Sequence, residues 1–442
     1  MKSMSDRRAC FIPFRRHACA LSLAFATVAS AHAAPVQIQV WHALPDANKA
    51  EFEKLAKQFN KDQSEVAVTL RAFPNRSALE AEATAAVKAK NAPNLIELED
   101  NHSPEVVAHD KAIMPLYQLL AKYPVKDQDW YLPSATSFVR DDKNRLLAFP
   151  YMAEIPVMFY NTDAYKKVGL NPNAPGATWA DLQADLLKLR DGDFECPYTT
   201  SDQVSVHLEN LAAVNNQPYT SNANGLGGGK AGASTLQFNS LFMRHIALMV
   251  SWKRSLLFTG HAQDNEADQR FAKGECTVLT SGSGAFGEFN KARKLSFGVA
   301  PLPYYAQVTP QAGRPFVSGS ALWAMAGRPQ AEDKATASFL AWLSSPVIAT
   351  KWHQETGYLP LTDAAFRASD VSFYNKFPGA HAVISSMKAP PGPNGRGFRM
   401  NNYAQIRLVL DRELNGALEG NVPPMTALDN ASSQAKAIAA KR

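Results

Sequence analysis

The stretch VQIQVWHALPDANKAEFEKLAKQFNKDQSEVAVTL, residues 36–70, decides the fold of this chain. Over its first five residues apolar and polar side chains alternate, which is typical of a β-strand with one buried face. A helical spacing of i, i+3, i+4 and i+7 comes next, and it is kept by Phe52, Leu55, Ala56 and Phe59. Alternation returns at 66–70, so the stretch predicts a strand, a helix and a second strand.

The following segments extend this pattern. Ser77 and Glu80 have the spacing of a capping box and predict a second helix that runs to about Lys90. Pro93 ends this helix, and a third strand is expected at 95–98. Strands that alternate with helices indicate an α/β domain with a largely parallel sheet. Later strands are expected at 155–160, 276–280 and 295–302, and later helices at 179–189, 240–252, 265–273, 332–343, 403–417 and 425–440.

The first 33 residues have the order of a secretory signal peptide. An apolar stretch at 18–29 is too short to span a bilayer. Ala31-His32-Ala33 supplies the small-x-small cleavage pattern, and we expect cleavage after Ala33. The alternative is an amino-terminal helix of the folded domain. Neither arginine pair precedes Phe-Leu, which favours Sec export over the twin-arginine route. The basic residues before the apolar stretch are Lys2, Arg7, Arg8, Arg15 and Arg16.

Removal of the leader changes the charge balance. Cutting 33 of the 442 residues leaves 409, enough for two domains with sizeable cores. The whole chain has 46 basic and 40 acidic side chains, and the leader holds five and one of them, so the mature chain has 41 and 39. A net charge of +2 gives no reason to expect a nucleic-acid partner. No later segment is apolar enough for a membrane span, so we expect a soluble protein outside the cytoplasm.

Two cysteines follow the leader, Cys196 and Cys276. An even pair in an oxidising compartment usually forms a disulfide, and we expect this bond. The alternative is two buried free thiols. Two cysteines do not make a disulfide scaffold, so the fold must rest on its hydrophobic core.

Sequences that look like catalytic or metal-binding motifs fail on particular residues. NGLGGGKA at 224–231 lacks the first glycine and the final Ser or Thr of a phosphate-binding loop. SGSG at 281–284 lacks the flanking glycines of a nucleophile elbow, which leaves a tight turn or backbone N–H groups that hold an anion or a hydroxyl. The ten histidines show no metal-ligand spacing, so we expect no metal and no cofactor.

Three acids lie at the end of the predicted third strand: Glu97, Glu99 and Asp100. Our first interpretation is a solvated surface. The second is binding of ligand hydroxyls, because the carboxyl ends of parallel strands commonly line a ligand site. The third is glycoside hydrolysis by paired carboxylates, for which the sequence gives no separation.

Four sets of residues together resemble a known family. They are WH at 41–42, FYNTDAYKKVGLNP at 159–172 with TWADL at 178–182, KWHQ at 351–354 followed by GYLPLTDAAF at 357–366, and NNYAQIRLVLDREL at 401–414. Over essentially the whole mature chain the sequence resembles the extracellular solute-binding proteins of ABC importers, family 1, in the maltose-binding-protein-like class. Within that class it is most similar to the members that bind glycerol-3-phosphate. WHQETGYLP and QIRLVLDREL are specific, whereas YNTDAYKK is shared by many sugar-binding relatives.

The resemblance implies an α/β fold of the type II periplasmic binding protein class, in which two discontinuous lobes surround a ligand cleft. The chain is expected to cross between lobes near 147–151, near 301–304 and near 350. Closure of the lobes on the ligand would be a hinge motion. The expected boundaries are 1–33 for the signal peptide, 34–149 and 303–350 for lobe 1, and 150–302 and 351–442 for lobe 2.

The resemblance also implies ligand contacts. Gly319 matches a glycine that lets the backbone approach the ligand, and Tyr358 matches a tyrosine whose hydroxyl reaches a ligand oxygen. Arg407 matches the arginine that pairs with phosphate, which a guanidinium can bind through two parallel hydrogen bonds. A surface arginine on a helix is the alternative for Arg407.

Other positions depart from the family pattern. A carboxylate at Glu154 repels phosphate unless Arg76 or Arg407 offsets it, whereas Glu154 and Asp100 together could bind polyol hydroxyls. The departures are Arg76 for Tyr, Asp100 for Glu, Glu154 for Ser, Gly282 for Ser with Ser283 beside it, and Asp202 and Ser205 for two tryptophans that line the cleft. The expected ligand-binding set is Arg76, Asp100, Glu154, Ser283, Gly319, Tyr358 and Arg407.

These observations predict a monomeric periplasmic protein that binds glycerol-3-phosphate or a related glycerophosphodiester and delivers it to the permease subunits of an ABC importer at the inner membrane. A receptor for a neutral sugar or polyol is the alternative within the class. A secreted hydrolase is the alternative from another class, and the sequence shows no catalytic constellation for it. We therefore expect no enzyme activity and no nucleic-acid partner.

Overall fold

The structure is a computed structural model, and it describes residues 34–99, 112–125, 129–132, 137–141, 143–227, 234–260 and 265–441. The chain divides into two units, Met1–Ala34 and Pro35–Arg442. The predicted signal peptide, 1–33, lies outside the described residues. All that follows concerns the second unit.

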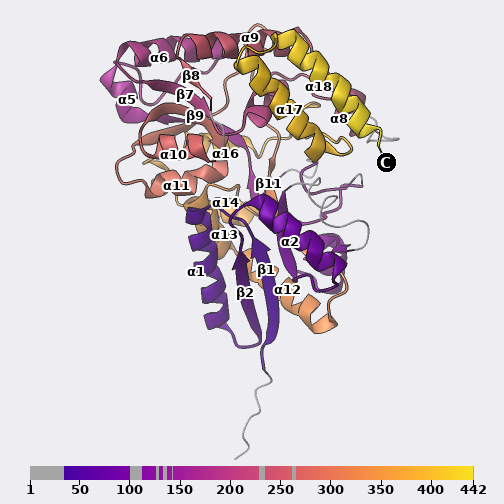
Figure 1. Cartoon of the computed structure of the whole chain (residues 1–442). Coiled ribbons are helices and arrows are strands. Elements are labelled where there is room, and N and C mark those ends of the chain that lie inside the picture. The colour runs from indigo at the N-terminus through magenta and orange to yellow at the C-terminus, as the bar shows by residue number, and fades with distance from the viewer. Residues whose placement is uncertain are drawn as a thin grey trace, which may run out of the picture. The chain divides into compact units, whose positions relative to one another are not determined.

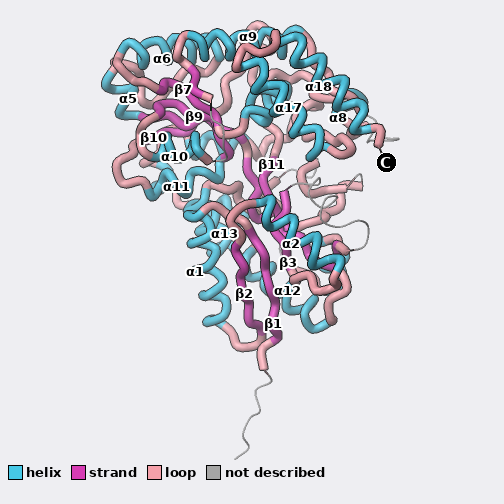
Figure 2. Tube along the Cα trace, viewed as in Figure 1, coloured by secondary structure: helices cyan, strands magenta, loops and turns pink. Residues whose placement is uncertain are grey.

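The first of two sheets has six strands in the order β2-β1-β3-β11-β4, and β5 joins it by pairing with β11 (Figures 1 and 2). Its strands are β1 (Val36–His42), β2 (Val66–Ala72), β3 (Leu95–Glu99), β4 (Ile113–Met114), β5 (Phe149–Glu154) and β11 (Ser318–Met325). The strands β1, β2 and β3 are parallel, while β11 is antiparallel to β3, β4 and β5. The predicted largely parallel sheet is therefore wrong. The sheet is mixed because β11 arrives from a distant part of the chain in the opposite direction.

Helices pack around this sheet and around one another: α1 (Asp46–Asp62), α2 (Arg76–Lys88), α4 (Leu116–Lys122), α12 (Gln330–Leu343), α13 (Pro346–Thr356) and α14 (Asp363–Ala368). The predicted apolar face of α1 is confirmed, because Phe52, Leu55, Ala56 and Phe59 are all buried. Phe59 lies 5.0 Å from Phe339 between ring centroids. Each such buried aromatic side chain contributes about 1.5 to 3 kcal/mol to folding.

The start of α2 differs from the prediction. The helix begins at Arg76, and the side chain of Asn75 caps it by accepting a hydrogen bond of 2.9 Å from the N–H of Ala78. Asparagine is as good an N-cap as serine, so the Asn75 cap replaces the predicted capping box of Ser77 and Glu80. As a result Arg76 occupies the first position of the helix.

The second sheet has five strands in the order β10-β6-β9-β7-β8 (Figure 2). They are β6 (Pro156–Asn161), β7 (Cys196–Thr200), β8 (Phe258–Thr259), β9 (Cys276–Gly282) and β10 (Phe297–Ala300). The short helices that accompany them are α5 (Thr162–Lys167), α6 (Trp179–Asp191), α10 (Glu266–Ala272), α11 (Phe286–Lys291), α15 (Val371–Tyr374), α16 (Ala380–Ser386) and a 3-10 turn (Ser283–Ala285). Its core includes Trp179, whose ring lies 6.0 Å from that of Trp252.

Three long helices form a further layer beside the second sheet: α9 (Ser240–Arg254), α17 (Tyr403–Leu418) and α18 (Pro424–Ala439) (Figure 1). Their shared apolar core contains Phe242, Ile406, Leu410 and Leu428. Shorter elements precede this layer in the chain, namely a π-helix (Ser205–Glu209), α7 (Asn210–Val214) and α8 (Ser221–Asn224). Because α17 is anchored along this apolar stripe, its polar face is held in a fixed orientation.

The chain passes from the first sheet to the second between Glu154, the last residue of β5, and Pro156, the first residue of β6. Residues 150–154 thus pair with the first sheet. The helix α13 also packs on that side, since Trp352 stacks on Tyr151 with ring centroids 4.6 Å apart and packs against α1. The expected lobe boundaries remain a prediction, and these contacts place the first passage a few residues later than 149.

Cys196 and Cys276 begin the neighbouring parallel strands β7 and β9 and are directly paired in register. Their sulfur atoms form a disulfide bond in the structure. The bond closes a segment with a sequence separation of 80 residues, at the end of β9 opposite to Gly282. Across the described ranges, no helix has the length and apolar character needed to cross a membrane.

Candidate functional site

Glu154 lies where the two sheets meet. Its Oε2 accepts a hydrogen bond of 2.9 Å from the N–H of Gly284, which follows β9. A Cβ atom on Gly282 would lie 2.5 Å from this oxygen, and one on Gly284 would lie 2.7 Å from it, so a side chain at either position would displace the Glu154 carboxylate. Burial raises the pKa of Glu154, while the Gly284 N–H and the charge of Arg76 act in the opposite direction.

Tyr358 packs against the same turn. Its ring is 6% exposed and stacks on Trp352, and its Cε1 would lie 2.5 Å from a Cβ on Gly284. The next residue, Leu359, donates its N–H to the carbonyl of Ala153 at 2.7 Å, which ties the segment to β5. Burial raises the pKa of Tyr358, and the nearby charge of Glu154 raises it further. The hydroxyl therefore stays protonated and can act as a hydrogen-bond donor.

Gly319 has a φ of +94°, a conformation that side chains other than glycine rarely adopt. A Cβ atom here would collide with the carbonyl oxygen of Met152 and would lie 2.9 Å from Cγ of Glu154. Because residue 319 is glycine, the backbone of β11 can come close to the backbone of β5, with which it pairs. Gly319 fixes the position of Glu154.

Ser283 is 6% exposed, and its Oγ accepts a hydrogen bond of 3.5 Å from the N–H of Ile155. The side chain faces the passage between the sheets. It also lines an apolar cavity together with Phe286, His353 and Tyr374. The structure therefore gives Ser283 a backbone partner at the passage.

The first sheet contributes one arginine and two carboxylates to this region. Arg76 forms an ion pair with Glu99, and their side chains are 45% and 35% exposed. Glu97 is buried and accepts hydrogen bonds from the N–H of Ala43 at 2.7 Å and from Oγ of Ser320 at 2.6 Å. Asp100, which we predicted as a ligand contact, lies outside the described residues.

The second sheet contributes a more elaborate set of charges. Arg407, on α17, forms an ion pair with Asp202, and their side chains are 32% and 37% exposed. Its Nε also lies 3.9 Å from Oε1 of Glu209, which accepts a hydrogen bond of 2.6 Å from the Tyr403 hydroxyl. The Tyr403 and Tyr219 hydroxyl oxygens are in turn 2.8 Å apart. Glu209, Tyr403 and Tyr219 therefore form a chain of buried polar groups on the buried side of the guanidinium.

A π-helix places the two acids that face Arg407. Oδ1 of Asp202 accepts a hydrogen bond of 2.9 Å from the N–H of Ser205, the first residue of the π-helix, and Glu209 is its last residue. Such widened turns are frequently found at functional sites. The sequence identified Asp202 only as a substituted position and gave no signal for Glu209. Their shared partner Arg407 is about 200 residues away in the chain, so only the fold brings them together.

These groups influence one another, and we call them the charged cluster: Arg76, Glu97, Glu99, Glu154, Asp202, Glu209 and Arg407. Burial opposes the ionisation of Asp202, but the charge and hydrogen bond of Arg407, the N–H of Ser205 and the charge of Arg76 together outweigh it, so the pKa of Asp202 lies below its usual value. The charge of Arg76 acts on both Glu154 and Asp202. The structure thus brings Arg76, Glu154, Gly319, Tyr358 and Arg407 into one region between the sheets.

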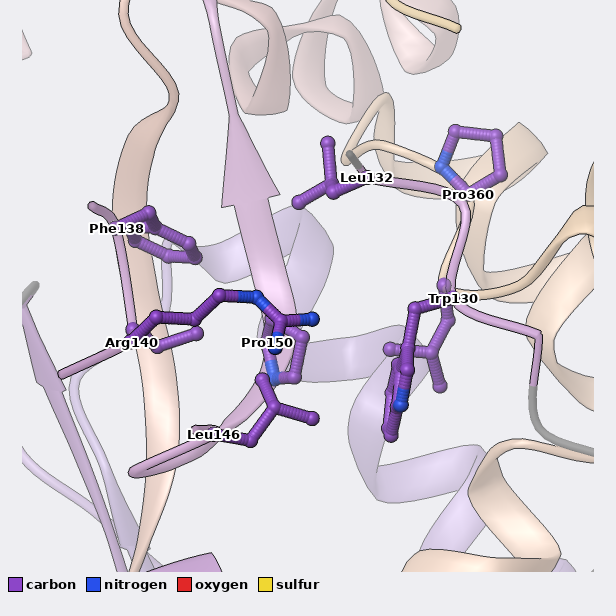
Figure 3. Close-up of a pocket in the computed structure, with 9 residues that line it drawn as sticks. Trp130, Leu132, Phe138, Arg140, Leu146, Pro150 and Pro360 are labelled. Carbon is purple, nitrogen blue, oxygen red and sulfur yellow. The ribbon is translucent and has the colours of Figure 1, made fainter. Parts of the chain in front are cut away.

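Two apolar cavities lie elsewhere, and no member of the charged cluster lines either of them. Figure 3 shows the first, where the Arg140 side chain lies among Trp130, Leu132 and Pro150. The second is the cavity behind Ser283. In the part of the chain that the structure describes, no group of three or more His, Cys, Asp or Glu side chains could hold a metal ion. The charged cluster offers hydrogen-bond donors and acceptors of the kind that hold a small polar ligand.

Comparison with known proteins places the chain in a family. A family profile described as "Bacterial extracellular solute-binding protein" matches residues 54–379. The sn-glycerol-3-phosphate-binding periplasmic protein UgpB of Yersinia enterocolitica is 34% identical over 94% of this chain and 94% of its own length. The protein of the same name from Escherichia coli is 32% identical over 95% and 96%.

A solved structure, that of UgpB from Mycobacterium tuberculosis in complex with glycerophosphocholine, superposes with a TM-score of 0.74 at 18% identity. The match covers 92% of this chain and 98% of that one, which shows a common fold. Maltose-bound MalE3 of T. maritima has the same fold, with a TM-score of 0.71. The family resemblance and the type II periplasmic binding fold expected from the sequence are confirmed. The chain belongs to the bacterial extracellular solute-binding protein family.

Proposed function

We propose that this protein is the periplasmic solute-binding component of an ABC importer and that it captures glycerol-3-phosphate or a related glycerophosphodiester. The relatives that are 32–34% identical carry the name of glycerol-3-phosphate-binding periplasmic proteins, which supports this ligand class and this compartment. The observation in the structure that carries the proposal is Arg407. Its side chain is one-third exposed and forms an ion pair with Asp202, whose charge in turn acts on Glu154.

The proposed binding mode uses the cluster and its neighbours. The guanidinium fork of Arg407 suits two phosphate oxygens, and the Tyr358 hydroxyl donates to a third ligand oxygen. Arg76 adds a second positive charge from the first sheet. Contacts from both sheets would then hold the two lobes together around the ligand.

We further propose that the two lobes close on the ligand and open to deliver it to permease subunits. The passage between β5 and β6 at Ile155 supports a hinge there, because it is the short connection between the two sheets. Binding and release without chemistry is the expected cycle. A secreted hydrolase, the alternative, would convert the ligand and change its mass. A binding protein should instead return the ligand with its original mass when the ligand is recovered from the purified protein.

A second candidate function is binding of a neutral sugar or polyol. It is favoured by the observation that Arg407 is already paired with Asp202 and lies near Glu209. A ligand without charge would leave these pairs intact and would bind through the carboxylates. The charged cluster has acceptors enough for several hydroxyls.

Substitution of Glu154 with glutamine separates these candidates. Glutamine keeps an acceptor for the Gly284 N–H but removes the charge. If the ligand is a phosphate ester, the substitution should leave the affinity unchanged or improve it, because a like charge is removed. If the ligand is a neutral polyol, affinity should fall by about 1.5 to 3 kcal/mol for each hydrogen bond to the lost charge.

The measurement is isothermal titration calorimetry on wild type and Glu154→Gln with glycerol-3-phosphate, glycerophosphocholine, maltose and glycerol. A thermal-shift screen precedes it, since a ligand at one hundred times its Kd stabilises the native state by about 2.7 kcal/mol. Absence of heat and of any thermal shift with every phosphate ester in the wild type would reject the proposed ligand class.

A further inference from the structure

The charged cluster has an excess of negative charge. It contains two arginines and five carboxylates, and each arginine already has an internal carboxylate partner, Glu99 for Arg76 and Asp202 for Arg407. Among the described residues Glu154 forms no ion pair, and its hydrogen-bond donor is the backbone N–H of Gly284. A dianionic ligand would therefore enter a site whose positive charges are neutralised.

Asp202 occupies the place where an anionic ligand would meet Arg407. Its Oδ2 is bonded to the terminal nitrogen of the guanidinium, and both side chains keep about a third of their surface exposed. Phosphate and this carboxylate would compete for the same donors. The other carboxylate, that of Glu209, approaches the guanidinium from the buried side and is held by Tyr403. Only the carboxylate of Asp202 can thus be exchanged for a ligand oxygen.

A ligand with both signs of charge resolves this competition. If a phosphate oxygen accepts one of the guanidinium hydrogen bonds of Arg407, the carboxylate of Asp202 loses part of its counter-charge. Glu154 has no counter-charge from an ion pair among the described residues. A cation carried by the same ligand restores the balance, because carboxylates bind ammonium groups through charge-assisted contacts. A phosphate monoester, with two negative charges and no cation, makes the imbalance worse.

We infer that this protein selects glycerophosphodiesters with a cationic amino-alcohol headgroup over glycerol-3-phosphate, and that Asp202 is the residue that sets this preference. The inference rests on the proposed function, since it takes a glycerol phosphate ester as the ligand. Asp202 acts in two ways. Its ion pair with Arg407 opposes binding of a phosphate group with two negative charges, and its carboxylate binds the cation of the headgroup.

The test is calorimetry at pH 7.5 with glycerophosphoethanolamine, glycerophosphocholine, glycerophosphoglycerol and glycerol-3-phosphate on wild type and Asp202→Asn. Asparagine keeps the oxygen that caps the N–H of Ser205, so the fold is retained. Asp202→Ser is a second neutral variant with a capping oxygen. Asp411→Asn is the matched control, because Asp411 lies one turn further along α17 and bonds to Gln203 and Asn415 outside the cluster.

In the wild type the two zwitterionic diesters should bind at least about tenfold more tightly than glycerol-3-phosphate. The affinity for glycerophosphoglycerol should lie between that for the zwitterionic diesters and that for glycerol-3-phosphate. Asp202→Asn and Asp202→Ser should reduce this ratio by at least about tenfold, mainly through tighter binding of glycerol-3-phosphate. The control should keep the wild-type ratio.

Two results would overturn the inference while the proposed function stands. One is a wild type that binds glycerol-3-phosphate as tightly as the zwitterionic diesters or more tightly. The other is a zwitterion preference that both Asp202 variants keep, which would assign the selection to other groups. Failure of the wild type to bind any of the four esters would instead reject the proposed function, and the inference with it.

Discussion

The two sheets each present one arginine and one buried carboxylate to the charged cluster, but they hold them differently. On the first sheet Arg76 is 45% exposed at the start of a helix, while the buried Glu97 accepts two hydrogen bonds. On the second sheet Arg407 is backed by Glu209 and the Tyr403 hydroxyl. Outside the charged cluster, the buried Asp268 of α10, a helix that packs against β9, has an oxygen, Oδ1, without a hydrogen-bond partner.

This difference shows which side of the site is fixed and which can adjust. A solvent-exposed ion pair such as that of Arg76 contributes about 0 to 1 kcal/mol and can rearrange around a ligand. The Arg407 guanidinium is positioned by a chain of polar contacts that reaches into the core, so its geometry is set before the ligand arrives. We therefore expect the second sheet to determine what binds and the first sheet to complete the enclosure.

The largest effect is expected from Arg407→Ala. Loss of the guanidinium removes the phosphate partner and leaves Asp202 and Glu209 without their counter-charge. Truncation of one partner of such a charge pair costs about 2 to 5 kcal/mol, or about 30-fold to several thousand-fold in Kd. Calorimetry with glycerophosphocholine should show this loss.

The matched control for that experiment is Arg412→Ala on the same helix. Arg412 is 60% exposed and bonds to Glu413 and Gln434 on the outer face. Its removal should change Kd by less than about twofold, since exposed pairs contribute little. Equal losses in the two variants would contradict a specific role for Arg407.

The next effect concerns stability and its dependence on pH. Burial raises the pKa of Asp268 to about 7, whereas the unfolded chain releases this proton near 3.8. Between these values the folded state holds a proton that the unfolded state has lost, so this group makes stability fall as pH rises, and the full penalty is present above pH 7. The difference corresponds to at most about 4 kcal/mol.

Urea unfolding of wild type and Asp268→Asn at pH 4, 5.5, 7 and 8 measures this effect. The free energy of unfolding of the variant, relative to wild type, should increase steadily with pH up to about 7 and then level off. All other titrating groups are common to the two proteins and cancel in the difference. A difference that stays constant over this range would show that Asp268 is ionised in the folded state.

The smallest effect is expected from Arg76→Ala. Because the Arg76–Glu99 pair is exposed on both sides, its loss should weaken binding of glycerophosphocholine by less than about fivefold. The same calorimetric titration used for Arg407→Ala checks this. A loss as large as that of Arg407→Ala would remove the distinction between a fixed side and an adjustable side.

Local patterns allowed much of the first sheet to be predicted from the sequence. The alternation at 36–40 and the spacing from Phe52 to Phe59 reflect burial of one face, which depends only on neighbouring residues, and both elements are confirmed. Strands β5 and β11 were not predicted as sheet members, because their pairing joins residues more than 160 positions apart. Fully buried strands of this kind carry no alternation that would reveal them.

The candidate site also has a part that the sequence predicted and a part that it could not predict. Motif resemblance pointed to Tyr358 and Arg407. The structure brings Tyr358 close to Glu154, and it pairs Arg407 with Asp202, whose charge acts on Glu154. The pairing of Arg407 with Asp202 could not be predicted, since it depends on how α17 packs against the π-helix. The sequence showed that Asp202 replaces a tryptophan of the family pattern, but it did not show which residue Asp202 pairs with.

A crystal structure of the protein grown with glycerophosphocholine tests the proposed binding site most directly. We expect an intact ligand between the two sheets, with phosphate oxygens about 2.7 to 2.9 Å from the Arg407 guanidinium nitrogens and a ligand oxygen at the Tyr358 hydroxyl. A ligand located in either apolar cavity, or a phosphate group with no contact to Arg407, would contradict it.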